Sequence, residues 1–174
     1  IECLVRKQKN AAQMLHLSPT KPPTMKKREA YDLSFNYELT DFRFESIGRQ
    51  GVILKAIEFR FYRKGRWNLA FGDVKGKYWT DDVVSDNGDM RKVLQTVANA
   101  VHLFLSRYPG RKVWIEPLSR KHKFLYNRIF QQKHEEIAEE FEVRGVLLLE
   151  DENELTEAYQ PGKIYDAFIL SLKL

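Results

Sequence analysis

The sequence contains one cysteine among its 174 residues and no apolar run long enough to span a membrane. Because Cys3 stands alone, an internal disulfide framework and a cysteine-rich zinc site are both excluded. A membrane-spanning helix needs about 20 mostly apolar residues, and no such stretch occurs. The opening residues also lack the apolar block and the small-residue cleavage site of a secretory signal. We therefore expect a soluble, cytoplasmic protein.

Residues 25–174 also have almost no excess of either charge when they are counted apart from residues 1–24. The formal net charge is +5, but residues 1–24 hold four basic side chains against one acid. The remaining 150 residues carry 25 basic and 23 acidic side chains. A general polyanion-binding surface needs a basic excess on the domain itself, so this balance argues against one.

The length and composition fit one globular domain preceded by a different kind of segment. Three prolines fall within residues 18–24, which is typical of a stiff linker rather than of a packed element. Regular hydrophobic patterning begins soon after Met25. We interpret residues 1–24 as a poorly ordered leader, an upstream translation or a remnant of a longer protein; the alternative is a loosely docked extension. A single α+β domain is expected over residues 25–174.

The first half of this domain alternates apolar and polar residues with the period of a β-strand. Three strands are expected, over residues 37–46, 52–64 and 67–74. In the second of them, Ile57, Phe59 and Phe61 would share one face. Short turns between the strands predict an antiparallel meander.

The second half contains two helical patterns. Val93, Val97, Val101 and Leu105 recur at helical spacing, after capping residues in the segment 85–89. A second helix is expected after Ser119, whose side chain would cap it.

Three further strands are expected around these helices, over residues 112–117, 143–149 and 164–172. The acidic segment 150–157 is expected to form a solvated loop. The order β-β-β-α-β-α-β-β predicts an α+β fold, with a mostly antiparallel sheet flanked by two helices.

Several short blocks carry a resemblance to a known family. They include Asn68-Leu69-Ala70-Phe71-Gly72-Asp73, Ser85-Asp86-Asn87-Gly88-Asp89 and the closing segment 162–168. These blocks resemble a family of small bacterial proteins of unknown function, about as long as this domain. The resemblance implies a start near Met25 and no particular activity.

The element order is also similar to the later part of the GNAT-type N-acetyltransferase fold. That resemblance implies that Tyr126, in the pair Leu125-Tyr126, would act as general acid toward the sulfur of departing coenzyme A. It also implies that the pyrophosphate of acetyl-coenzyme A would lie on the N-terminus of the first helix.

The loop that matches this pyrophosphate site departs from the family pattern. It contains Asn87, Gly88 and Asp89, with one glycine, no arginine and a second carboxylate on Asp86. We expect Asp86 and Asp89 to satisfy the helix N-terminus and to repel a pyrophosphate.

The expected second helix begins with an unusual concentration of cations. Arg120, Lys121 and Lys123 fall in its first turn, where each cation opposes the helix dipole by about 0.3–1 kcal/mol. Arg128 follows on a similar face about two turns beyond Lys121. These four residues indicate an anion site for a phosphate, a nucleic-acid backbone or an acidic protein. The alternative is pairing with nearby carboxylates, namely Glu116, Glu135 and Glu136.

Two weaker patterns have ordinary structural explanations. The hairpin around Tyr62 and Trp67 interleaves aromatic rings with cations, as single-strand binders do, but a solvated hairpin tip has the same composition. Its cations are Arg60, Arg63, Lys64 and Arg66. The carboxylates of Asp81, Asp82, Asp86 and Asp89 do not follow a calcium-loop spacing, so no metal site is expected.

Two functional hypotheses follow from the sequence. In the first, the protein is a non-catalytic binding module without a cofactor, which contacts a small partner protein or nucleic acid through the basic helix start. In the second, it is a divergent acyltransferase, with Tyr126 as acid and the Asn87-Gly88 turn near acetyl-coenzyme A.

Overall fold

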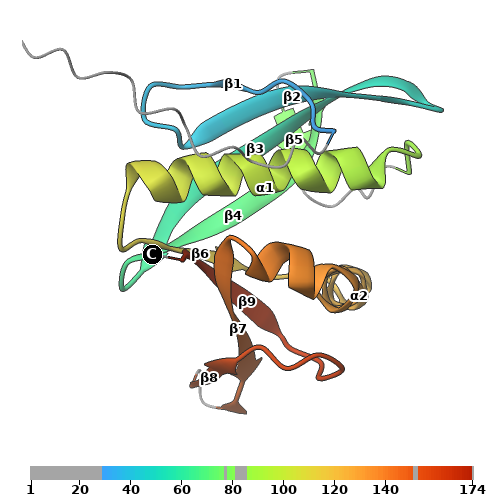
Figure 1. Ribbon diagram of the computed structural model, residues 1–174. Helices are drawn as coiled ribbons and strands as arrows, with labels where there is room; N and C mark the ends of the chain where they lie inside the picture. Colours follow the sequence, from blue (N-terminus) through green and yellow to red (C-terminus); the bar gives the residue numbers. More distant parts are fainter. Residues whose placement is uncertain (1–28, 77, 81–85, 151–152, 174) are drawn as a thin grey trace, which may run out of the picture.

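The computed structural model describes residues 29–76, 78–80, 86–150 and 153–173, so the predicted leader over 1–24 lies outside the described residues. One sheet and two helices account for the described elements (Figure 1). The helices are α1 (Met90–Arg107) and α2 (Arg120–Ala138). The strands are β1 (Ser34–Phe35), β2 (Asp41–Gly48), β3 (Gly51–Arg63), β4 (Arg66–Lys75), β5 (Tyr78–Thr80), β6 (Lys112–Ile115), β7 (Phe141–Leu148), β8 (Glu154–Ala158) and β9 (Ala167–Leu172).

The sheet order is β1-β2-β3-β4-β6-β9-β7-β8, and β5 pairs with β4 outside this path. The described strand pairs are antiparallel except for β4 and β6, which are parallel. This confirms the predicted α+β fold with a mostly antiparallel sheet and two helices. The prediction of a loop over 150–157 was wrong, because Glu154–Ala158 pairs with β7 as an edge strand.

Both helices contribute to one core on the same face of the sheet (Figure 1). Phe104 of α1 stacks on Phe59 of β3 with 4.3 Å between ring centroids, and Phe130 of α2 stacks on Phe168 of β9 at 3.9 Å. Stacked rings of this size bury large apolar areas and fix how each helix lies on the strands. Neither described helix combines the length and the apolar character that a membrane crossing requires.

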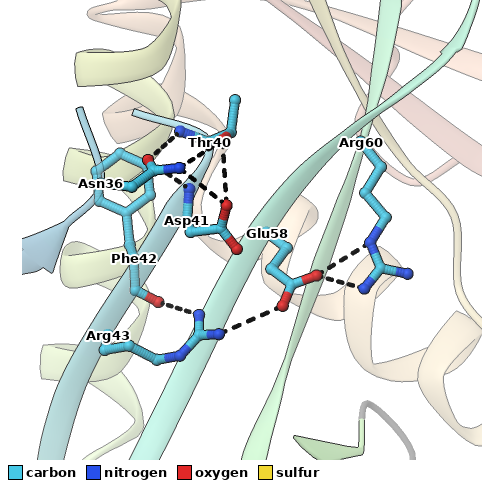
Figure 2. Close-up of polar contacts among 7 residues, drawn as sticks. All are labelled: Asn36, Thr40, Asp41, Phe42, Arg43, Glu58 and Arg60. Atoms are coloured by element: carbon cyan, nitrogen blue, oxygen red, sulfur yellow. Dashed lines mark hydrogen bonds and ion pairs between the residues drawn. The ribbon is translucent and has the colours of Figure 1, made fainter. Parts of the chain in front are cut away.

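The opposite face of β2 and β3 carries charged side chains that satisfy one another (Figure 2). Glu58 accepts a hydrogen bond from Arg43 at 3.4 Å and another from Arg60 Nε at 3.0 Å. Asn36 organises the turn before β2, because its side-chain oxygen accepts from the backbone N–H groups of Thr40 and Asp41. This part of the sheet is thus balanced in charge.

Candidate functional site

A cleft opens where the two parallel strands of the sheet separate. Only three residues of each strand pair: Arg66–Asn68 of β4 pair with Lys112–Trp114 of β6. Strand β6 then ends at Ile115, while β4 continues to Lys75. Open α/β sheets bind ligands at the carboxyl ends of such parallel strands, and both helices begin at this end. The cleft between α1 and α2 has a volume of about 940 Å³, which is within the usual size of a small-molecule site.

Apolar side chains form most of the cleft. The floor comes from the strands, through Leu69, Phe71 and Ile115. The two walls come from the facing sides of the helices, through Leu94, Val97 and Ala98 of α1 and Leu125, Tyr126 and Ile129 of α2. Polar groups gather at its ends, including Lys55, Asp89, His122 and Glu136. An apolar body with a few polar groups at defined places is the usual composition of a ligand site.

The face of α2 that lines the cleft is distinct from the face that carries the predicted anion site. Successive residues of an α-helix are 100° apart, so His122, Tyr126 and Ile129 share one side. Arg120, Lys121, Phe124 and Arg128 fall on the other side and are exposed. We call these four residues the outer stripe of α2. The two sequence-based hypotheses therefore concern different surfaces of the same helix.

The start of α1 is filled by the protein's own carboxylate. Asp89 is the N-terminal cap residue, but its side chain makes no capping bond. It instead accepts hydrogen bonds from Tyr31 at 2.7 Å and from Ser46 at 2.6 Å. The prediction that Asp86 and Asp89 satisfy the helix N-terminus was therefore wrong as to side-chain hydrogen bonds, although the negative charge of Asp89 does lie at the helix start. Asp86 lies on the surface, 3.4 Å from Arg49.

The same network keeps Asp89 ionised. Burial disfavours the charged carboxylate, but the hydrogen bonds from Ser46 and Tyr31 and the nearby charge of Lys55 outweigh it and lower the pKa of Asp89. Burial, together with the negative charge of Asp89, raises the pKa of the Tyr31 hydroxyl. A negative charge therefore remains at the start of α1, the place at which the resemblance to acetyltransferases implied a pyrophosphate.

Asn87 ties the same loop to the turn between β2 and β3. Its side-chain oxygen accepts from Gln50 N at 2.7 Å, and its amide donates to Ser46 Oγ at 3.0 Å. The fit leaves no space, since a Cβ at Gly48 would lie 1.9 Å from the Asn87 carbonyl oxygen. Asn87 and Asp89 therefore have structural roles, and Gly88 between them adopts a φ of 82° that favours glycine.

A buried ion pair beneath the cleft was not predicted. Lys55 Nζ lies 2.5 Å from Asp73 Oδ1, and the two side chains are 4% and 5% exposed. Lys55 also lines the cleft. The sequence contained a signal, because strand alternation puts Lys55 on the same face as Ile57 and Phe59, where a charged residue needs a partner.

The start of α2 differs from that of α1 in its cap and in its charge. Ser119 accepts a hydrogen bond from His122 N at 3.3 Å, which confirms the predicted capping role. Lys123 pairs with Asp166 at 2.5 Å, and the Arg120 guanidinium lies 5.7 Å from the centre of the Phe124 ring. Within the described residues, Arg120, Lys121 and Arg128 of the outer stripe form no ion pair.

The carboxylates proposed as alternative partners, Glu116, Glu135 and Glu136, form no ion pair with these cations in the described chain. Glu116 accepts from the indole N–H of Trp114 at 2.9 Å, and Glu136 lies 3.0 Å from Lys133. Of the four predicted anion-site residues, only Lys123 has a carboxylate partner in the described chain, and that partner is Asp166. The structure thus separates Lys123 from the other three.

Two weaker patterns are explained by the fold. Arg60 binds Glu58, while Arg63 and Arg66 both bind Glu154 of β8, so the arginines of the β3–β4 hairpin are paired. Asp81 and Asp82 lie outside the described residues. No group of three or more metal-ligating side chains occurs in the part of the chain that the structure describes.

Comparison with known proteins gives a family but no function. The family model that matches residues 27–173 is described as a family of unknown function, DUF6934. The chain belongs to this family. Searches of the curated proteins and of the solved structures found no match. The DUF6934 match covers the sheet, both helices and the cleft, so these elements belong to the part of the chain that defines the family.

Proposed function

We propose that the protein is a binding domain whose ligand lies in the cleft between α1 and α2. The observation that supports this most is the separation of β4 and β6 beneath two helices that both begin at the same end of the sheet. The cleft suits a mostly apolar ligand, because Leu69, Phe71 and Ile115 form its floor. The polar groups at its ends would orient that ligand.

A fluorescent apolar probe tests the cleft directly. We expect anilinonaphthalene sulfonate to bind the native protein at one site, and Ala98→Trp to abolish binding by filling the cleft. Ile129→Trp should act in the same way from the opposite wall. Ser106→Trp places the same ring on the exposed last turn of α1 and serves as the control. Undiminished probe binding by both filled, folded variants would reject the cleft as the site.

A second candidate is acyl transfer from acyl-coenzyme A, because Tyr126 lines the cleft. Its ring lies beside His122, with 6.1 Å between the ring centroids. In this reaction the Tyr126 hydroxyl would donate a proton to the departing thiolate. The carboxylate of Asp89 disfavours a pyrophosphate at the start of α1, so the cofactor would need a different phosphate contact.

The acyltransferase candidate has an inexpensive test. A ligand that binds only the native state must raise the unfolding temperature, so acetyl-coenzyme A at millimolar concentration should give a measurable shift. No shift would reject this candidate while leaving the binding domain intact. If a shift occurs, Tyr126→Phe should preserve it and abolish any release of free coenzyme A.

The outer stripe of α2 is proposed as a second contact surface, for an anionic partner. Arg120, Lys121 and Arg128 are exposed at a helix start that has no acidic residue in its first turn. Lys123 would contribute less, since Asp166 already neutralises it. We expect tripolyphosphate to bind the wild type in calorimetric titration and the double variant Arg120→Glu, Lys121→Glu to lose binding. Unchanged affinity would refute this surface.

A further inference from the structure

Phe124 lies in the middle of the outer stripe of α2 and is 58% exposed. Its only ring contact among the described residues is the Arg120 guanidinium, one helical turn earlier, at 5.7 Å. Lys121 and Arg128 lie on either side of it on the same helix face. An aromatic ring is thus presented to solvent between three cations that pair with no described carboxylate.

A second exposed phenylalanine, Phe61, has different surroundings and serves as a comparison. Phe61 on the β3–β4 hairpin is 64% exposed, but its ring packs edge-on against Trp67 at 6.0 Å. The arginines around it are neutralised by Glu58 and Glu154. Single exposed apolar residues are normal on protein surfaces. What distinguishes Phe124 is the combination of an accessible ring face with cations that pair with no carboxylate in the described part of the chain.

We propose that the outer stripe of α2 binds a short single-stranded nucleic acid, with one base stacked on Phe124 and phosphates on Arg120, Lys121 and Arg128. This inference rests on the anion-contacting role proposed above and names the partner. Aromatic rings stack on every base, and neighbouring arginines hold the backbone. A base inside a duplex has no free face, so the strand must be unpaired.

The charge of the domain limits the length of the site. Residues 25–174 carry nearly equal numbers of basic and acidic side chains, so no extended track for a long polyanion is expected. Three cations on about two turns of helix suit a few nucleotides. Each phosphate that a cation neutralises on a single strand contributes about 0.7 to the slope of log Kd against log salt concentration. Three such contacts should give a slope of about 2 in magnitude.

The test uses fluorescein-labelled decauridylate and fluorescence anisotropy at low salt on the full chain. Phe124→Ala should weaken binding about tenfold, since removing one stacking ring from such sites has effects of this order. Phe124→Trp should bind at least as tightly as the wild type. Phe61→Ala is the matched control and should leave the affinity unchanged. Both rings are more than half exposed, so the variants should remain folded at the assay temperature, and thermal unfolding checks this.

Two further ligands, tripolyphosphate and poly-glutamate, distinguish base stacking on Phe124 from simple anion binding by the outer stripe. We expect Phe124→Ala to bind tripolyphosphate as the wild type does, while Arg120→Glu with Lys121→Glu loses both ligands. Equal binding of decauridylate by wild type and Phe124→Ala would overturn the stacking role even if tripolyphosphate still binds. Tighter binding of poly-glutamate than of decauridylate would also overturn it, in favour of an acidic protein partner.

Discussion

The two helices begin at the same end of the sheet, and both have cations and no acidic residue in the first turn, yet their cap residues differ. At α1 the carboxylate of Asp89 lies at the helix start, held by Tyr31 and Ser46. At α2 the cap is the neutral Ser119, and exposed cations follow it. A helix N-terminus attracts negative charge; Asp89 supplies that charge at α1, whereas the cap of α2 is neutral and its first turn has no acidic residue.

This difference divides the polar residues of the two helix starts into those that bond within the fold and those for which we propose an external partner. Asn87 and Asp89 bond to β2, to the β2–β3 turn and to Tyr31, and their chemistry is used within the fold. Arg120 and Lys121 make no ion pair among the described residues and oppose the helix dipole, and the contact of Arg120 with the Phe124 ring is exposed to solvent. The following predictions test that division.

The largest effect is expected from the ion pair beneath the α1 end of the cleft. Asp73→Ala leaves the Lys55 charge buried without this partner, and breaking such pairs typically costs about 3–5 kcal/mol. Urea unfolding should therefore show a large fall in the free energy of unfolding. A loss below about 1 kcal/mol would show that water reaches Lys55 and that the end of the cleft is open.

The next effect concerns the carboxylate at the start of α1. Asp89→Ala removes the acceptor of two short hydrogen bonds and should cost about 1–3 kcal/mol in unfolding free energy. Asp86→Ala, three residues earlier, is the control, because that side chain is 83% exposed and its pairing with Arg49 should contribute little. Equal losses in the two variants would contradict the internal role of Asp89.

The same carboxylate predicts an acid sensitivity. Its pKa is lower in the folded than in the unfolded chain, so between those two values the unfolded chain binds more protons. Its contribution to stability is therefore complete above the unfolded pKa and is lost as the pH falls through the folded pKa. Unfolding free energies measured from pH 6 downward should fall less steeply for Asp89→Asn than for the wild type. If the unfolding free energies of the two proteins fell equally with pH, another group would control the acid sensitivity.

The smallest effect should have the opposite sign. Replacing Arg120 and Lys121 by glutamate removes two charges that oppose the helix dipole, and each removal alone should raise stability by about 0.3–1 kcal/mol, with the new carboxylates acting in the same direction. Thermal unfolding should show a slightly higher midpoint together with the loss of tripolyphosphate binding. A lower midpoint would mean that these cations stabilise the fold through contacts of their own.

Local patterns in the sequence predicted the elements well. The apolar stripe of α1 is confirmed, since Val93, Val101 and Leu105 are buried, and so is the cap at Ser119. Such features depend on residues a few positions apart. Phe61 was expected to share a face with Ile57 and Phe59; unlike Phe59 it is exposed, and it lies near the end of β3 with its ring against Trp67.

The cleft could not be predicted, because it depends on where β4 and β6 separate. The paired residues Arg66 and Lys112 are 46 positions apart in sequence, and neither strand's own sequence shows how many residues will pair. The role of Asp89 was missed for the same reason, since Tyr31 and Ser46 are 58 and 43 positions away. Strand β8 was missed because its acidic composition resembles that of a solvated loop. In the structure Glu154 of β8 pairs with Arg63 and Arg66.

The most direct test compares the two helix starts with matched variants. Tripolyphosphate affinity is measured by calorimetry for the wild type, for Arg91→Glu with Lys92→Glu in the first turn of α1, and for Arg120→Glu with Lys121→Glu in the first turn of α2. We predict that the α1 variant binds like the wild type and that the α2 variant does not bind. Loss of binding in the α1 variant, with binding retained in the α2 variant, would contradict the account.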